Sequence, residues 1–184
     1  MDSIKVFAPA TVANVVCGYD ILGFAIEEPG DEIILRKNDF NQIIITKIEG
    51  DNGKLPKDPA KNVVSHVIRL FLEKINSNQG IDIELYKKMP LNSGMGSSAA
   101  SSVAALVAIN ELMEKPFSKQ DLLPLAMEGE RIACGNAHAD NVAPALLGGL
   151  VLIRSYEPLD ALKLRYPQDL SVVSVHPHVD VPTG

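Results

Sequence analysis

The 184-residue chain contains no tryptophan, two cysteines and only 5% aromatic residues. Cys17 and Cys134 cannot build a disulfide framework and lack metal-ligand spacing, which fits a reducing compartment. Basic residues are also few, with 17 Lys and Arg against 23 Asp and Glu, and the formal net charge is −6. A nucleic-acid-binding surface would require clustered Lys and Arg. The composition therefore counts against a disulfide-rich scaffold and against a nucleic-acid-binding protein.

Long apolar runs are missing as well. No stretch is long enough to cross a bilayer, and the N-terminus has no basic segment followed by an apolar one. The apolar share of 46% is nevertheless that of a globular protein with a real core. We therefore predict a cytoplasmic protein without membrane contact, with one domain or one domain and part of another.

Apolar periodicity and turn residues predict a mixture of strands and helices. Strands are expected at residues 4–8, 32–37, 42–48, 81–89, 150–155 and 170–176, with 32–37 and 42–48 joined as a hairpin. Helices are expected at residues 62–75, 99–113 and 118–134, followed by a short helix capped by Asp140. The chain stops soon after the last expected strand, which suggests a fragment or a second domain that has barely begun.

The most informative stretch lies between the strand at 81–89 and the helix that follows it. Its residues are Pro90, Leu91, Asn92, Ser93, Gly94, Met95, Gly96, Ser97, Ser98, Ala99 and Ala100. Glycines let an anion approach the backbone, and the first N–H groups of a helix favour negative charge. We interpret the stretch as a triphosphate-binding loop. A tight turn with a serine N-cap remains the structural alternative.

Glu130 is the most informative charged residue. A helical projection places Gln120, Asp121 and Arg131 on the wet face of the third helix and Glu130 on the apolar side. A carboxylate there is costly unless it is paired or bound to a metal. Mg²⁺ takes few protein ligands and bridges phosphate oxygens, so one serine hydroxyl and one carboxylate suit it. The alternative is an edge position whose side chain reaches water.

Other polar residues carry weaker signals. His138, Asp140 and Asn141 precede the short helix. A plain N-cap explains Asp140, whereas no structural role requires an asparagine at position 141. Turn chemistry alone explains the segment around Asp20. Asn62 begins a helix, and it serves either as an N-cap or as a contact to an adenine.

The loop at 90–100 resembles the phosphate-binding motif Pro-x-x-x-Gly-Leu-Gly-Ser-Ser-Ala of the GHMP kinases, with Met95 in place of Leu. Residues 9–23 resemble the N-terminal motif Pro-Ala-Thr-x-x-Asn-x-Gly-x-Gly-Phe-Asp-x-x-Gly of homoserine kinases within that superfamily. There, Val16 stands in place of a glycine and Tyr19 in place of Phe. The run Asp-Asn-Val-Ala-Pro at 140–144 strengthens this likeness, which extends over residues 5–176.

The resemblance implies an α+β fold with ribosomal-protein-like βαβ layers. Residues 1–160 would form the N-terminal ATP-binding domain of a GHMP kinase. Residues 161–184 would open a ferredoxin-like C-terminal domain that is truncated here, without the family's third glycine-rich motif. A chain of this extent is expected to be inactive by itself.

The resemblance also implies an activity, which is the Mg²⁺- and ATP-dependent phosphorylation of the L-homoserine hydroxyl in threonine biosynthesis. The motif serine and a later glutamate hold the metal in these kinases, and they match Ser98 and Glu130. The loop residues, with Asn62, would bind ATP. Glu130 would thus belong to the catalytic machinery.

The substrate residues follow from the same resemblance. Asp20 would pair with the homoserine ammonium, Asn14 would help to bind its carboxylate, and His138 would lie near the reacting end. Asn141 matches the position of the proposed base in related kinases, but an amide cannot take up a proton. Catalysis would then rest on positioning and charge stabilisation, which suits phosphoryl transfer.

Two other interpretations stay open. A sister GHMP kinase of the mevalonate type would act on another small alcohol. A non-catalytic nucleotide-binding or RNA-binding module would share part of the architecture, although the acidic balance counts against RNA. The sequence also leaves the oligomeric state open, with a homodimer as one option.

Overall fold

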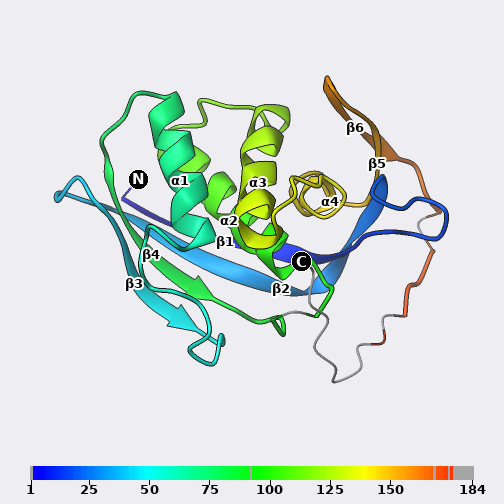
Figure 1. Cartoon of the computed structure of the whole chain (residues 1–184), viewed down its shortest axis with the longest axis horizontal. Helices are drawn as coiled ribbons and strands as arrows, with labels where there is room; N and C mark the ends of the chain where they lie inside the picture. Colours follow the sequence, from blue (N-terminus) through cyan, green and yellow to red (C-terminus); the bar gives the residue numbers. More distant parts are fainter. Residues whose placement is uncertain (1, 92, 168, 174, 176–184) are drawn as a thin grey trace.

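The structure is a computed structural model that describes residues 2–91, 93–167, 169–173 and 175. Its elements, in chain order, are β1 (Ser3–Val12), β2 (Leu22–Asn38), β3 (Ile43–Glu49), α1 (Val63–Lys74), β4 (Gly80–Tyr86), α2 (Ser97–Leu112), α3 (Lys119–Cys134), α4 (Val142–Leu147), β5 (Leu150–Tyr156) and β6 (Leu159–Leu164). Figure 1 shows the helices gathered on one face of the sheet. The predicted α+β class is confirmed.

The long strand β2 organises the sheet. It pairs antiparallel with β1, with β4 along its second half, and with β5 over its first three residues. The order across the sheet is β3-β4-β2-β5-β6, with β1 also on β2. β1 passes through a bulge between Pro9 and Thr11 and continues to Val12, beyond the predicted end at Ala8. This continuation carries Thr11 into the region where α2 begins.

The hairpin predicted from 32–37 and 42–48 is wrong. β4 lies between the two strands, with Leu35 opposite Ile83 on one side and Ile45 opposite Ile83 on the other. β3 runs parallel to β4 at the edge of the sheet. Ile81, Ile83 and Leu85 of β4 are fully buried, as an interior strand requires, whereas Ile45 is the one buried residue of β3, which fits an edge strand.

The predicted helices are confirmed to within two residues at each end. Asn62 caps α1 through a hydrogen bond from the Val64 N–H (3.0 Å), and Ser118 and Asp121 form a reciprocal capping box on α3. α2 is apolar on all sides, and twelve of its sixteen residues are buried. It packs against the sheet and against the other three helices, so its N-terminus is fixed by the core.

Two predictions near the end of the chain need correction. Asp140 does not cap α4: Asn141 holds the N-cap position, in helical backbone and without a side-chain capping bond. The strand expected at 170–176 is not formed at its described residues, 170–173 and 175. Apolar residues there are exposed, and a strand forms only against a hydrogen-bonded neighbour. His176 lies outside the described residues, and the domain division at 160 stays a prediction.

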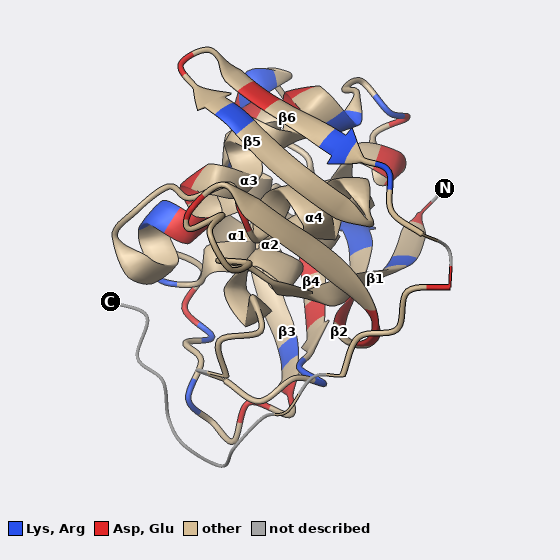
Figure 2. Cartoon of the chain, turned by 90° about the vertical axis from the view of Figure 1, so that its right-hand side faces the viewer, with Lys and Arg blue, Asp and Glu red and all other residues tan. Residues whose placement is uncertain are grey.

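Charges are spread over the molecule. Figure 2 shows acidic and basic residues interspersed on the face that carries β5 and β6. Arg154 and Asp160 form an ion pair between these two strands (2.6 Å). Within the described residues, no helix combines the length and the apolar content needed to cross a bilayer.

Candidate functional site

A cavity of about 640 Å³ lies beside the N-terminus of α2. It is lined by segments far apart in the sequence, namely the β1–β2 loop, the start of α1, the 91–98 loop, the end of α3 and the residues before α4. Most of the predicted site residues line it: Asn14, Asp20, Asn62, Leu91, Ser93, Gly94, Gly96, Ser97, Ser98, Glu130, His138 and Asn141. The fold therefore brings together residues that the sequence could only propose one by one.

The glycines of the 93–98 segment, hereafter the phosphate loop, both have left-handed backbone. Gly94 has φ +71° and Gly96 has φ +65°, and Gly96 is the N-cap residue of α2. The buried hydroxyls of Ser93 and Ser97 have no hydrogen-bond partner among the described residues. Because no side chain caps the helix, its first N–H groups are open to an anion as well. Orphaned donors of this kind fit a polyphosphate.

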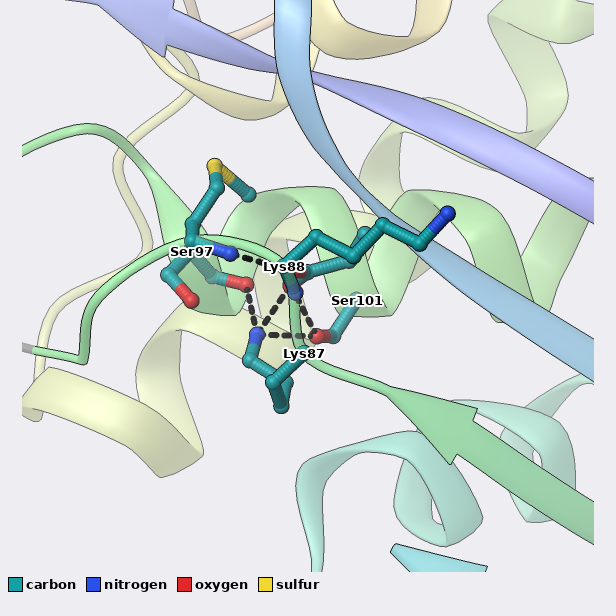
Figure 3. A network of polar contacts seen from close by, with 6 residues as sticks. Lys87, Lys88, Ser97 and Ser101 are labelled. Carbon is teal, nitrogen blue, oxygen red and sulfur yellow. Dashed lines mark hydrogen bonds and ion pairs between the residues drawn. The ribbon is translucent and has the colours of Figure 1, made fainter. Parts of the chain in front are cut away.

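A buried ion pair supports the phosphate loop from below (Figure 3). Lys87 at the end of β4 pairs with Asp31 of β2, and its ammonium also donates to the Ser97 carbonyl (2.9 Å) and to the Ser101 hydroxyl (2.7 Å). The second Asp31 oxygen accepts the N–H groups of Lys88 (3.0 Å) and Met89. Burial lowers the pKa of Lys87, and the Asp31 carboxylate opposes that shift. The network therefore ties the start of α2 to two strands.

Glu130 is buried at the cavity wall, as predicted, with a relative exposure of 7%. Its oxygen Oε1 has no partner in the described part of the chain, and the Ser98 hydroxyl lies beside the carboxylate, where it favours the charged form. Burial raises the pKa of Glu130, the Ser98 hydrogen bond opposes the shift, and the nearby Asp140 carboxylate reinforces it. An orphaned carboxylate oxygen next to a hydroxyl and an anion site fits a Mg²⁺ ion.

The opposite wall of the cavity is polar. Asn14 has left-handed backbone (φ +57°), and its Oδ1 accepts the Asp20 N–H at 2.8 Å. The Asp20 carboxylate lies 3.3 Å from Nδ1 of His138. Tyr156 connects the two segments, since its hydroxyl donates to the Asp20 carbonyl (2.7 Å) and accepts the Ala139 N–H (3.3 Å). The three predicted substrate residues Asn14, Asp20 and His138 thus form one cluster.

Thr11 and Asn141 meet where the phosphate loop turns into α2. The buried Thr11 hydroxyl donates to Oδ1 of Asn141 at 2.8 Å, and the Thr11 N–H donates to the Met95 carbonyl at 3.1 Å. A Cβ on Gly96 would collide with the Thr11 hydroxyl and lie 2.8 Å from Asn141 Oδ1. Gly96 is therefore required for close contact as well as for its backbone conformation.

Some predicted site residues do not line the cavity. Pro90 is exposed, Met95 is packed against the core, and Ala99 and Ala100 are fully buried inside α2. These four residues shape the loop and the helix rather than face the cavity. Asn62 lines the cavity, but both ends of its amide are engaged, by the Val64 N–H and the Pro56 carbonyl (2.8 Å). Asn92 lies outside the described residues.

Sequence reasoning missed Asp31, Lys87 and Ser101, and it explained Asp140, which is buried at the cavity, as an N-cap. Lys87 and Asp31 are 56 residues apart, and no local pattern connects them. Burial raises the pKa of Asp140, and the nearby His138 opposes that shift. Thr11 belongs to the N-terminal motif, but the sequence assigns it no role, because its hydrogen-bond partner Asn141 is 130 residues away.

Comparison with known proteins identifies the domain. Residues 62–149 match the family model "GHMP kinases N terminal domain". The chain is 53% identical over 194 residues to a homoserine kinase of Chlorobium phaeobacteroides (strain BS1), with 100% of this chain and 61% of that protein aligned. A homoserine kinase of Methanococcus vannielii is 39% identical, with 100% of this chain and 60% of that protein aligned. The chain thus spans about 60% of the length of these relatives.

Solved structures of related kinases show the same similarity as the sequence comparisons. The crystal structure of a homoserine kinase from Cytophaga hutchinsonii superposes with a TM-score of 0.93 at 58% identity, covering 100% of this chain and 58% of that one. The mevalonate kinase of Methanococcus jannaschii superposes with a TM-score of 0.69 at 19% identity, covering 89% of this chain and 56% of that one. The second likeness shows the shared fold alone.

Proposed function

The chain belongs to the GHMP kinase family, and on this basis we propose that it forms the ATP-binding part of a homoserine kinase. The reaction transfers a phosphoryl group from ATP to the hydroxyl of L-homoserine, giving O-phospho-L-homoserine. One observation carries the proposal. The unpartnered oxygen of Glu130, beside the Ser98 hydroxyl, lies on the same cavity as the open phosphate loop.

The nucleotide is assigned to the phosphate loop. The open N–H groups at the start of α2 and the unpartnered hydroxyls of Ser93 and Ser97 would bind phosphate oxygens. Ser98 and Glu130 would hold Mg²⁺, which when bound neutralises charge on the phosphates. The buried Lys87 lends positive charge directly beneath the loop, although its ammonium is already shared among Asp31, Ser97 and Ser101.

The alcohol substrate is assigned to the cluster on the opposite wall. Asp20 would pair with the homoserine ammonium, and the free amide group of Asn14 would contact its carboxylate. His138 and Asn141 border the space between this cluster and the phosphate loop. Since Asn141 cannot accept a proton, these residues would act by orienting the hydroxyl in line with the phosphoryl group.

The test is homoserine-dependent ADP release by the full-length protein, with mevalonate and galactose as competing alcohols. We expect release with homoserine alone. Release with mevalonate instead would show a sister kinase. ATP binding without phosphorylation of any alcohol would indicate a non-catalytic module.

Glu130→Gln separates the metal role from folding. We expect a loss of Mg²⁺-dependent turnover on the order of 10²-fold or more. Glu128→Gln is the matched control, because Glu128 lies on the same helix and its ion-pair partner among the described residues is the exposed Arg131 (3.1 Å). Equal turnover in the two variants would remove the metal assignment.

A homodimer stays a separate prediction.

A further inference from the structure

We propose that Thr11 is a positioning residue that fixes the orientation of the Asn141 amide, so that its NH₂ group faces the anion held by the phosphate loop. The inference rests on the proposed function and specifies how Asn141 takes part in it. Thr11 itself does not line the cavity, whereas Asn141 does. Thr11 therefore acts through Asn141.

The first argument concerns the direction of the hydrogen bond. An asparagine amide has one end that accepts hydrogen bonds and one end that donates them. The Thr11 hydroxyl donates to Oδ1 of Asn141 at 2.8 Å, and Thr11 has a relative exposure of 0%, so no solvent competes for this hydroxyl. With the accepting end engaged, the donating end is the one left for the cavity.

The second argument concerns the N-cap position. An asparagine at an N-cap normally uses its side-chain oxygen to accept an N–H from the first turn of its helix. Asn141 occupies the N-cap of α4 without such a bond. Its oxygen serves Thr11 instead, so the local capping preference gives way to a contact between β1 and α4.

The third argument concerns the phosphate loop. The Thr11 N–H donates to the Met95 carbonyl (3.1 Å), and a Cβ added to Gly96 would meet both the Thr11 hydroxyl and Asn141 Oδ1. One residue of β1 therefore sets the loop and the amide relative to each other. Oδ1 is the atom of Asn141 next to Gly96 and it is already engaged by Thr11, so the NH₂ group is the donor left to stabilise charge on a transferring phosphoryl group.

The test compares Thr11→Val, which keeps the shape but removes the hydroxyl, with Thr11→Ser, which keeps the hydroxyl. In the full-length protein we expect Thr11→Val to lower kcat on the order of 10²-fold, with a much smaller, several-fold rise in KM for ATP. Thr11→Ser should retain most of the rate. Equal rates for Thr11→Val and the wild type, or equal losses in the two variants, would overturn the proposal.

A double-mutant cycle tests whether Thr11 acts through Asn141. In an Asn141→Ala background, Thr11→Val should cause no further loss, and multiplying losses would contradict the proposal. Asn141→Asp replaces the donor by an acceptor and should be at least as impaired as Asn141→Ala. An Asn141→Asp variant with wild-type rate would show that the residue accepts a hydrogen bond instead.

A binding measurement keeps this inference separate from the proposed function and from failed folding. A donor aimed at the terminal phosphate should make the protein prefer a non-hydrolysable ATP analogue over ADP, and Thr11→Val should reduce that preference several-fold while Thr11→Ser preserves it. If the wild type phosphorylates no homoserine but shows this pattern, the proposed function fails and the positioning role stands. An unchanged preference in a folded Thr11→Val protein would overturn the positioning role.

Discussion

Val16 holds a backbone conformation that β-branched residues rarely adopt. Its φ is +52°, and its side chain is 94% exposed, so packing does not compensate for the strain. Left-handed backbone costs an L-residue roughly 1–2 kcal/mol. The N-terminal motif that this segment resembles has glycine at the corresponding position, which any φ suits. The strained backbone of Val16 thus lowers the stability of the turn that positions Asn14 and Asp20.

Val16→Gly should therefore stabilise the protein. The relieved strain exceeds the added backbone entropy of glycine, and the expected gain is about 0.5–1 kcal/mol in the free energy of unfolding. Urea denaturation measures it. Val16→Ala keeps a Cβ and serves as the control with little gain. A loss of stability in Val16→Gly would contradict the strain assigned to this turn.

Glu130 also lowers the stability of the folded protein. Burial raises the pKa of its carboxyl above the ordinary value, so the folded protein favours the protonated form. The stability that this group contributes is full below its ordinary pKa and is lost as the pH rises through the raised pKa. At neutral pH the charged carboxylate, with one oxygen unpartnered, therefore weakens the metal-free protein.

Glu130→Gln should raise the melting temperature of the metal-free protein at pH 7, in contrast to its effect on turnover. Removing an unsatisfied buried charge corresponds to about 1–3 kcal/mol. The difference from wild type should shrink as the pH falls towards 4, where the glutamate is protonated. Thermal unfolding in chelator at several pH values measures this. A variant less stable than wild type at pH 7 would show that the carboxylate is satisfied.

At the scale of elements, the Lys87–Asp31 pair joins three of them. Lys87 directly follows β4, Asp31 lies in β2, and Ser101, which donates to Asp31 at 3.0 Å, lies in the second turn of α2. Both charged groups are almost completely buried. Removing one partner of such a pair leaves an uncompensated charge, which is far more costly than loss of a surface ion pair.

Lys87→Met should destabilise the fold by about 3–5 kcal/mol. The neighbouring Lys88 pairs with Glu32 at the surface (2.8 Å), and Lys88→Met should cost well under about 1 kcal/mol. Urea denaturation of both variants makes the comparison. Adding Asp31→Asn to Lys87→Met should recover part of the loss. Similar costs for the two lysines would contradict a structural role of the buried network.

Elements with local signals could be predicted from the sequence, and those with distant partners could not. Asn62 and the Ser118–Asp121 box mark helix starts within a few residues, so α1 and α3 were placed correctly. The pairing of β3 depends on β4, which comes more than thirty residues later, and the local pattern indicated a hairpin instead.

The same distinction applies to the candidate site. The phosphate loop is contiguous, and Glu130 is identified by helical periodicity, so both were found. Asp31 lies between Gly30 and Glu32 in β2, and Thr11 lies near the end of β1, two residues after Pro9, so neither stands out in a local pattern. Their roles appear only when the sheet brings their partners within hydrogen-bond distance.

At the scale of the whole molecule, the β5–β6 hairpin is less firmly attached than the rest of the sheet. β5 pairs with β2 over only three residues, Leu22–Phe24, whereas β4 pairs with β2 over seven. β6 contacts the sheet through β5, and Leu162 is exposed. Regions with few buried contacts open at lower free energy than the global unfolding reaction.

Native-state hydrogen exchange should therefore divide the chain into two groups. Amides of β2, β4 and α2 should exchange only through global unfolding, and those of β6 should exchange by local opening at a lower free energy. The 184-residue chain alone can be used for this measurement, provided that circular dichroism shows it to be folded. Equal protection of β6 and β4 would show that the hairpin unfolds together with the core.

Because α2 is buried on every side, residues in its interior can affect the candidate site at its N-terminus. Its first turn is the proposed anion site, and its interior includes Leu106 and Ile109, both with a relative exposure of 0%. Close-packed interiors transmit volume changes rather than absorb them. A methyl group added or removed two turns into this helix is therefore expected to displace the backbone N–H groups of its first turn, where the nucleotide is proposed to bind. Substitutions at those inner positions are therefore expected to weaken nucleotide binding, although the side chains do not line the cavity.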